Sequence, residues 1–216
     1  MYLQKKEKML QSLPCLEEEL SRVLRNRKKT VLPVDGMIEA AVLIPLYAKN
    51  GRIHVLLTKR SEMVEHHRGE ISFPGGKLDP EDPDLLTCAL READEEVGIA
   101  AEDVRIIGEL DDFYTVATNF LVVPFVGIIP YPYEFSPCSR EIADLIGVPL
   151  DVFFDSDRRS EELWIIKGQT VEIVSYKWKG HNIWGATARI MKHFVEMLEN
   201  GASCAYMGGS QEGTCR

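Results

Sequence analysis

Long apolar runs are absent from this sequence. None approaches the roughly 20 residues that a membrane-spanning helix needs. The charged segment at residues 1–8 is also not followed by the apolar core of a signal peptide. We therefore expect a cytoplasmic protein with no membrane partner.

Cysteine motifs and an excess of basic residues are missing as well. The five cysteines are widely spaced and form no CxxC pair, so a zinc site is not expected and a reducing compartment fits. The formal net charge is −9, whereas general nucleic-acid binding needs a basic surface. A polyanionic substrate would have to be bound by metal and a few local cations. We expect a small-molecule partner and no nucleic acid.

What is present suits one globular domain. A chain of 216 residues with 45% hydrophobic content fits a single α/β domain with an ample core. We predict an N-terminal helical segment at residues 1–30 that packs on the domain, the domain itself at 31–199 and a disordered tail at 200–216. Pro14 favours a helix start near it over one continuous N-terminal helix. Packing of this segment on a second subunit, in a homodimer, is the alternative.

Strand signals recur along the domain. Residues 38–47 and 52–60 are rich in Val, Ile and Leu, and the Asn50-Gly51 pair between them predicts a hairpin. Further strands are expected at residues 104–110 and 119–129, and a second hairpin around Gly168 at residues 163–167 and 170–178. Residues 183–199 predict a helix whose apolar face, Trp184 included, belongs to the core.

The most informative stretch lies at residues 75–99. Asp82-Pro83 predicts a helix start, with Asp82 as the N-cap. Small and aliphatic residues then recur at helical spacing and predict one buried stripe: Leu86, Ala89, Leu90, Ala93 and Val97. Gly98 suits a left-handed C-cap.

Three carboxylates lie close together near the end of this helix. Glu92, Glu95 and Glu96 share a face roughly 100° wide. Like charges at such spacings destabilise a helix unless something neutralises them, and oxygen ligands of this kind are preferred by Mg²⁺ and Mn²⁺. A solvated acidic face is the alternative interpretation.

The segment READEEVGI at residues 91–99, with the glycine pair at 75–76, resembles the Nudix box. That family hydrolyses diphosphates linked to another moiety and uses divalent metal. The resemblance implies an α/β Nudix fold, with a mixed β-sheet packed between helices as an α-β-α sandwich. The sequence departs from the general pattern because Asp82 occupies the place of a glutamate and eight residues, not seven, separate it from Arg91. The same one-residue extension is found in the coenzyme A-cleaving branch.

Flanking segments resemble that branch too. LLTKRS at residues 56–61 and GEISFPGG at 69–76 are similar to its LLTxRS and FPGG motifs, and IWGATARI at 183–190 is similar to its terminal helix. The branch has an arginine four residues after the serine, where this chain has Glu65. Recognition of a 3′-phosphate would then fall to His66, His67 and Arg68.

The resemblance implies roles for individual residues. Glu92, Glu95, Glu96 and the Gly76 carbonyl would hold Mg²⁺ or Mn²⁺, and Arg91 would orient a glutamate. We predict Arg91, Glu95 and Glu96 as catalytic residues. The general base stays open between Glu95 and three later carboxylates: Glu109, Asp111 and Asp112. The candidate substrate-binding residues are Arg60, Glu70, His67 and Lys77.

Several functions fit these residues. One is hydrolysis of coenzyme A or its derivatives to 3′-phosphoadenosine 5′-phosphate and 4′-phosphopantetheine. A second is hydrolysis of another nucleoside diphosphate derivative, such as ADP-ribose, NADH or a dinucleoside polyphosphate. A third is a Nudix-fold binding module without catalysis, although the box carboxylates are all present.

Overall fold

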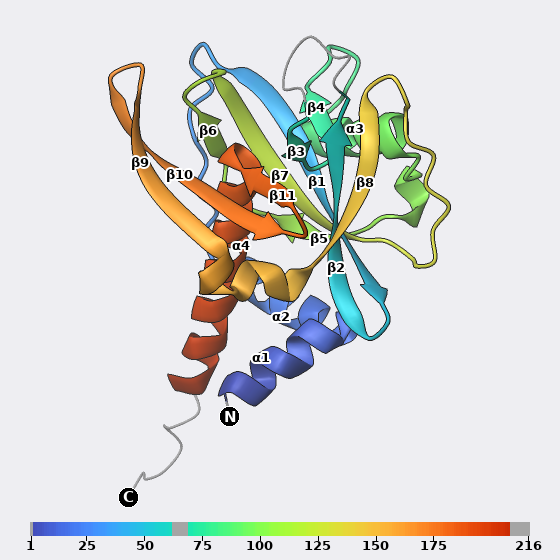
Figure 1. Cartoon of the computed structure of the whole chain (residues 1–216), viewed down its shortest axis with the longest axis vertical. Coiled ribbons are helices and arrows are strands. Elements are labelled where there is room, and N and C mark those ends of the chain that lie inside the picture. Colours follow the sequence, from blue (N-terminus) through green and yellow to red (C-terminus); the bar gives the residue numbers. More distant parts are fainter. Residues whose placement is uncertain (1, 62–68, 208–216) are drawn as a thin grey trace, which may run out of the picture.

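The computed structural model describes residues 2–61 and 69–207 (Figure 1). Its helices are α1 (Tyr2–Gln11), α2 (Leu13–Arg25), α3 (Leu85–Val97) and α4 (Gly185–Met207). Its strands are β1 (Ile38–Lys49), β2 (Arg52–Arg60), β3 (Ile71–Ser72), β4 (Gly75–Lys77), β5 (Arg105–Glu109), β6 (Phe113–Thr115), β7 (Phe120–Ile128), β8 (Ile142–Pro149), β9 (Arg159–Ile166), β10 (Gln169–Trp178) and β11 (His181–Trp184).

Strand β1 organises the larger of two sheets. It pairs antiparallel with β2 and β4 and parallel with β7, which makes this sheet mixed. Strands β9, β10 and β11 form the second, antiparallel sheet.

The larger sheet separates two hydrophobic cores. Leu43 faces a core that includes Ala89 and Ala93 of α3. The next residue, Ile44, faces the other core, which includes α2 and α4. This alternation follows from the two-residue period of a strand. Helices therefore cover both faces of the sheet, as the α-β-α expectation requires.

The predicted hairpins are confirmed. Asn50 and Gly51 have φ of 52° and 70°, and Lys49 pairs with Arg52 across the turn. Positive φ at both central residues matches the twist of the flanking strands. The second hairpin turns at Lys167-Gly168, but β9 begins at Arg159, earlier than predicted. The β9–β10 hairpin projects at the upper left of Figure 1.

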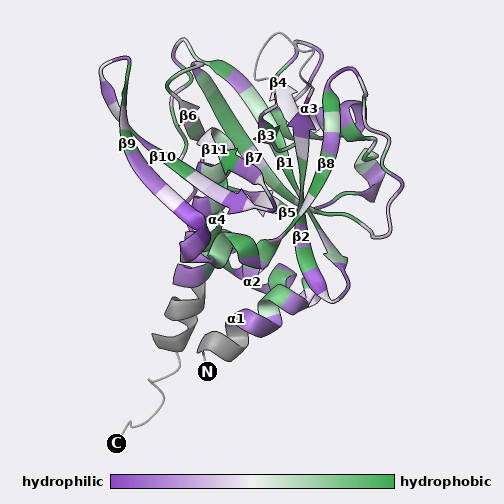
Figure 2. Cartoon of the chain, viewed as in Figure 1, coloured by the Kyte–Doolittle hydropathy of each residue, from purple (hydrophilic) through white to green (hydrophobic). Residues whose placement is uncertain are grey.

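The N-terminal segment forms two helices, which Ser12 separates. Pro14 lies in the first turn of α2. Leu16 and Leu20 of α2 are fully buried against the core of the same chain. Figure 2 shows α2 below the larger sheet in this view, and strand β7 of that sheet is predominantly hydrophobic (green). At the other end, α4 begins after Trp184 and continues past the predicted end at residue 199 to Met207. The first residues of the expected tail are therefore helical.

In the described part of the chain, no helix combines the length and apolar character needed to cross a membrane.

Candidate active site

Helix α3 begins two residues later than predicted. Its N-cap is Asp84, whose carboxylate accepts a hydrogen bond of 2.7 Å from the Thr87 amide. The predicted N-cap, Asp82, instead closes the preceding turn, because its amide donates to the Asp79 carbonyl and its carboxylate accepts from the Asp79 amide. The predicted C-cap is confirmed, since Gly98 is left-handed with φ of 71°.

The buried stripe of α3 is narrower than predicted. Ala89, Ala93 and Val97 are fully buried, whereas Leu86 and Leu90 are half-buried. Cys88 is buried too, and its Sγ donates toward the Lys77 carbonyl at 3.4 Å. The helix is thus fixed against both the sheet and the glycine loop.

Asp82 pairs with Arg91 in a fork of two hydrogen bonds. Arg91 Nε donates to Asp82 Oδ1 at 3.0 Å, and Nη2 donates to Oδ2 at 2.9 Å. These hydrogen bonds to Arg91 lower the pKa of Asp82 to about 2. The aspartate side chain is short, and the longer turn before α3 brings it to the guanidinium.

Arg91 also binds the box glutamates. Its Nη1 donates to Glu92 Oε1 at 2.9 Å and to Glu95 Oε2 at 3.1 Å. The guanidinium, whose pKa Asp82 and Glu92 raise, therefore bridges Asp82 and the two glutamates. Arg91 therefore contacts both glutamates, and its predicted role of orienting a glutamate stays a prediction.

Glu92 lies directly against Gly76. Strand β4 pairs with β1, with Gly76 opposite Ala41, and this fixes the glycine over the helix. A Cβ at Gly76 would lie 2.5 Å from the Glu92 carboxylate carbon, closer than real contacts allow. Burial raises the pKa of Glu92. The lack of a side chain at residue 76 leaves room for this carboxylate beside the loop backbone.

Glu96 is the most buried of the three box glutamates, with 7% of its side chain exposed. Its Oε2 accepts a hydrogen bond of 3.3 Å from the Gly75 amide, and its Oε1 lies 3.7 Å from Arg60 Nη1. Burial raises the pKa of Glu96 to about 7, although the Gly75 hydrogen bond and the Arg60 charge oppose this rise. Arg60, at the end of β2, thus reaches the box from a separate strand.

Glu95 points the other way, with 61% of its side chain exposed. Across residues 2–61 and 69–207, no three His, Cys, Asp or Glu side chains form a ready-made metal-binding group. Glu92 lies with Gly76 and Arg91, whereas Glu96 lies with Gly75 and Arg60. Glu92 and Glu96 nevertheless repel each other, since the charge of Glu92 contributes to the raised pKa of Glu96. Buried carboxylates that share a site in this way fit an added cation.

A cavity of about 390 Å³ lies beside the box. It brings together the predicted residues Arg60, Glu70, Gly76 and Lys77. His67 lies outside the described residues, as do Glu65, His66 and Arg68. Four of the predicted positions from separate segments therefore share one cavity.

Trp184 and Arg189 also line this cavity and were not predicted as site residues. Trp184, predicted as core, ends β11 and is 40% exposed in the cavity wall. Arg189 of α4 also lines the cavity and donates to the Tyr114 carbonyl at 3.3 Å. The prediction for Trp184 was wrong because the helix starts after this residue. The IWGATARI segment was the signal that could have found both.

The later carboxylates have other partners. Asp111 accepts from the Thr30 amide at 2.9 Å and also binds Arg27, while Asp112 accepts from the Leu32 amide at 3.0 Å. Glu109 pairs with Lys29 at 2.9 Å. None of these acids lines the cavity beside the box. These contacts hold residues 27–32 against the domain. Because the three acids are engaged there and lie outside the cavity, the geometry disfavours them as general bases.

Comparison with known proteins decides the family. A profile of the NUDIX domain matches residues 37–178. The chain belongs to the Nudix family. This Nudix protein is 37% identical over 162 residues to a Yersinia enterocolitica protein named uncharacterized Nudix hydrolase NudL, covering 74% of this chain and 80% of that protein. A protein of the same name from Photorhabdus laumondii is 33% identical over 173 residues, covering 76% and 87%.

Similar solved structures are also Nudix proteins. A MutT/nudix family protein from Enterococcus faecalis aligns with a TM-score of 0.47 and 14% identity, over 87% of this chain and 70% of that chain. An Ap4A hydrolase from C. elegans, in a binary complex, aligns with a TM-score of 0.46 and 18% identity, over 78% and 98%. From its family, this chain is a Nudix pyrophosphohydrolase, and hydrolases of the family generally need divalent metal ions.

Proposed function

We propose that this Nudix hydrolase cleaves the diphosphate of coenzyme A or a coenzyme A derivative. Water would add to one phosphorus and the bridging P–O bond would break, giving 3′-phosphoadenosine 5′-phosphate and 4′-phosphopantetheine. The observation that carries the proposal is the position of the LLTKRS segment. It contains Arg60, whose guanidinium lies 3.7 Å from Glu96 and whose side chain lines the cavity beside the box. This position supports a role in substrate binding for the segment that resembles the coenzyme A branch.

The metal would be Mg²⁺ or Mn²⁺, held by Glu92 and Glu96 with the Gly76 carbonyl, and by Glu95. These are hard oxygen ligands, and Glu92 and Glu96 each accept one hydrogen bond from the described residues. When bound, such an ion lowers the pKa of a water ligand and polarises the phosphates. Arg91 is the positioning residue, because it holds Glu92 and Glu95 through one guanidinium.

The cations of the cavity suit the diphosphate. Arg60, Lys77 and Arg189 reach the cavity from β2, β4 and α4. A chain with a net charge of −9 needs such local cations to hold a polyanion. We assign Arg60 and Lys77 to phosphate binding, Glu70 to contact with the polar groups of the substrate, and His67 to the 3′-phosphate. Glu95 is our candidate general base, since it is the box carboxylate most open to solvent.

The rest of the cavity is mainly apolar. Phe120, Ile166, Val171 and Trp184 contribute to its wall. A flat adenine ring can stack on an exposed tryptophan, and the pantetheine arm can lie along aliphatic side chains. A substrate with a charged centre and apolar ends fits a cavity that has both cationic and apolar walls.

The test is mass spectrometry of the products formed from a panel of substrates with Mg²⁺ or Mn²⁺. The panel contains coenzyme A, ADP-ribose, NADH and a dinucleoside polyphosphate. We expect 4′-phosphopantetheine from coenzyme A, with Glu96→Gln nearly inactive. The control Glu81→Gln changes an exposed carboxylate in the loop before α3 and should keep full activity.

Cleavage of another member of the panel, with coenzyme A intact, would refute the substrate assignment but keep the mechanism. Folded, metal-loaded protein that cleaves none of them would instead favour a non-catalytic binding module.

A further inference from the structure

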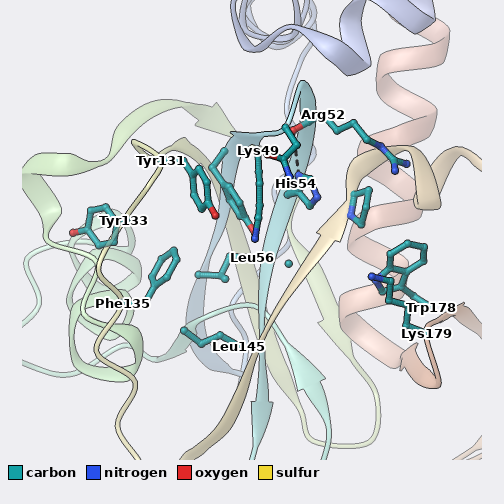
Figure 3. A pocket seen from close by; sticks show the side chains of 14 residues that line it. Lys49, Arg52, His54, Leu56, Tyr131, Tyr133, Phe135, Leu145, Trp178 and Lys179 are labelled. Carbon is teal, nitrogen blue, oxygen red and sulfur yellow. Dashed lines mark hydrogen bonds between the residues drawn. The ribbon is translucent and has the colours of Figure 1, made fainter.

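A second cavity, of about 520 Å³, lies away from the box. The β1–β2 hairpin, β8 and the β10–β11 turn contribute to its wall, and it shares no residue with the cavity beside the box. Figure 3 shows Tyr131, Tyr133 and Phe135 on one side of this cavity and Trp178 with Lys179 on the other. Its volume lies within the range of about 300–1,000 Å³ that is typical of small-molecule sites.

Stacked aromatic rings form one part of the wall. The Tyr47 ring stacks on His54, with centroids 5.4 Å apart, and on Tyr131, with centroids 5.1 Å apart. Tyr47 itself is buried, whereas Tyr131 is 39% exposed. The Tyr131 ring therefore ends a rigid stack beside the solvent, where another flat ring can join it.

The stack is fitted closely to β8. A Cβ at Gly147 would collide with the Tyr47 hydroxyl, so the glycine leaves the space that this hydroxyl occupies. Burial raises the pKa of Tyr47 to about 12, and the hydroxyl stays protonated at neutral pH. It can thus donate a hydrogen bond on this side of the cavity.

Cations line this cavity, but acids do not. Lys49, Arg52 and Lys179 contribute to the wall, and the described lining contains neither aspartate nor glutamate. This composition is unexpected in a chain with 34 acidic and 25 basic residues. The cavity therefore carries a local positive charge that attracts anions.

The two lysines face aromatic rings. Lys49 Nζ lies 5.4 Å from the Tyr131 ring centroid, and Lys179 Nζ lies 5.1 Å from that of Trp178. Within residues 2–61 and 69–207, neither lysine has a carboxylate partner in an ion pair. Arg52, by contrast, pairs with Asp151. The lysine charges are thus available to a ligand that also contacts the rings.

The turn at Lys179 sets where that side chain lies. Lys179 has φ of 45° and is followed by Gly180 with φ of 82°. Positive φ at both residues matches the twist of the flanking strands, in which Trp178 pairs with His181. The hairpin thus places Lys179 in the cavity wall.

We propose that this second cavity binds a nucleotide, with the base on the aromatic rings and the phosphates at Lys49 and Lys179. A nucleotide combines a flat ring with negative charge and fits the available volume. Aromatic rings interleaved with cations recognise nucleotides because every base has a stacking face. The proposal does not depend on which diphosphate the box cleaves.

The probe is ADP, titrated calorimetrically into the full chain with EDTA present. We expect Tyr131→Ala and the charge reversals Lys49→Glu and Lys179→Glu each to weaken one binding event by about tenfold or more. All three side chains are at least partly exposed, so the variants should keep the wild-type melting temperature. They should also keep the wild-type rate of diphosphate hydrolysis. The matched control, Arg189→Gln in the cavity beside the box, should leave that binding event unchanged.

Four results would overturn the proposal. One is ADP binding that only Arg189→Gln weakens, which would assign it to the cavity beside the box. Another is binding of inorganic diphosphate as tight as that of ADP, which would mean that the base does not contact the aromatic rings. The third is preference for a single-stranded oligonucleotide over ADP, which would replace the free nucleotide by nucleic acid. Absence of any ADP binding would refute the proposal equally.

Discussion

The missing side chain at Gly76 decides where the Glu92 carboxylate can lie. We expect Gly76→Ala to reduce diphosphate hydrolysis by about 100-fold, because the new Cβ would push Glu92 from its place and small displacements in a site are costly. The carboxylate is the far end of a flexible side chain and can move aside. Steady-state kinetics and thermal unfolding should therefore show a large loss of rate with a small change in melting temperature.

A double-variant cycle provides the control for this prediction. If Gly76→Ala acts through Glu92, its effect should shrink sharply in a Glu92→Gln background. Fully additive losses in rate would mean that the methyl group disturbs something other than this carboxylate.

The Asp82–Arg91 ion pair should make stability depend on pH. The folded-state pKa of Asp82, about 2, is below its ordinary value of 3.8. The pair therefore stabilises the fold above the ordinary pKa, and this contribution is lost as the pH falls from about 4 toward 2. At pH 7 we expect Asp82→Asn to lower the free energy of unfolding by about 2 kcal/mol.

Urea unfolding at a series of pH values measures this difference. Asp79→Asn is the matched control, since Asp79 also faces Arg91 but at 3.8 Å and with 58% of its side chain exposed. Asp79→Asn should change the free energy of unfolding by no more than about 0.5 kcal/mol. An Asp82→Asn difference that is as large at pH 3 as at pH 7 would show that titration of this carboxyl is not the cause.

Individual site residues could be predicted only in part. Helical spacing placed Glu92, Glu95 and Glu96 on one face, but it could not distinguish the exposed Glu95 from the buried Glu96. That difference comes from β4, which lies against only part of the face. The same limit applies to Asp82, because the choice between Asp82 and Asp84 as N-cap depends on the turn before the helix.

Helix α2 is held by leucines that enter the core of the domain. Leu16 is fully buried against it. We expect Leu16→Ala to lower the free energy of unfolding by about 2–5 kcal/mol, through lost burial and the cavity that remains. Leu163→Ala in β9 makes the same truncation where the side chain is 74% exposed, and should change it by about 0.5 kcal/mol or less. Equal effects in urea unfolding would mean that α2 is not part of the cooperative unit.

Elements with strong local chemistry were predictable. The Asn50-Gly51 turn fixed one hairpin, and the composition of β7 allowed its prediction from apolar content alone. Strand β4 was not predicted, since its Gly-Gly-Lys sequence has no strand propensity and is extended only because β1 lies beside it. Short strands of this kind depend on tertiary pairing, which the sequence does not express locally.

The charge of the whole molecule is distributed unevenly. Net charge is −9, yet basic side chains meet at both the box cavity and the second cavity. Global composition disfavours a nucleic-acid surface, but it does not reveal these local clusters. They depend on strands that are distant in sequence and adjacent in the fold.

Metal binding should be visible in the stability of the whole chain. A ligand at 100 times its dissociation constant stabilises a fold by about 2.7 kcal/mol, which raises the melting temperature of a domain of this size by roughly 5–10 °C. We expect Mn²⁺ or Mg²⁺ to produce such a rise in the wild type and in Glu81→Gln. Glu92→Gln and Glu96→Gln should lose most of it in thermal scans with and without EDTA. An undiminished rise in both would place the ion elsewhere.

The guanidinium of Arg91 has a consequence for how the enzyme is switched on. Because it bridges Asp82, Glu92 and Glu95, these carboxylates are held in place by a cation of the chain itself. Folding of the site and loading with metal are then separate events, unlike in small domains that fold only around their ion. A chelator should therefore abolish activity while the protein stays folded, and added metal should restore that activity.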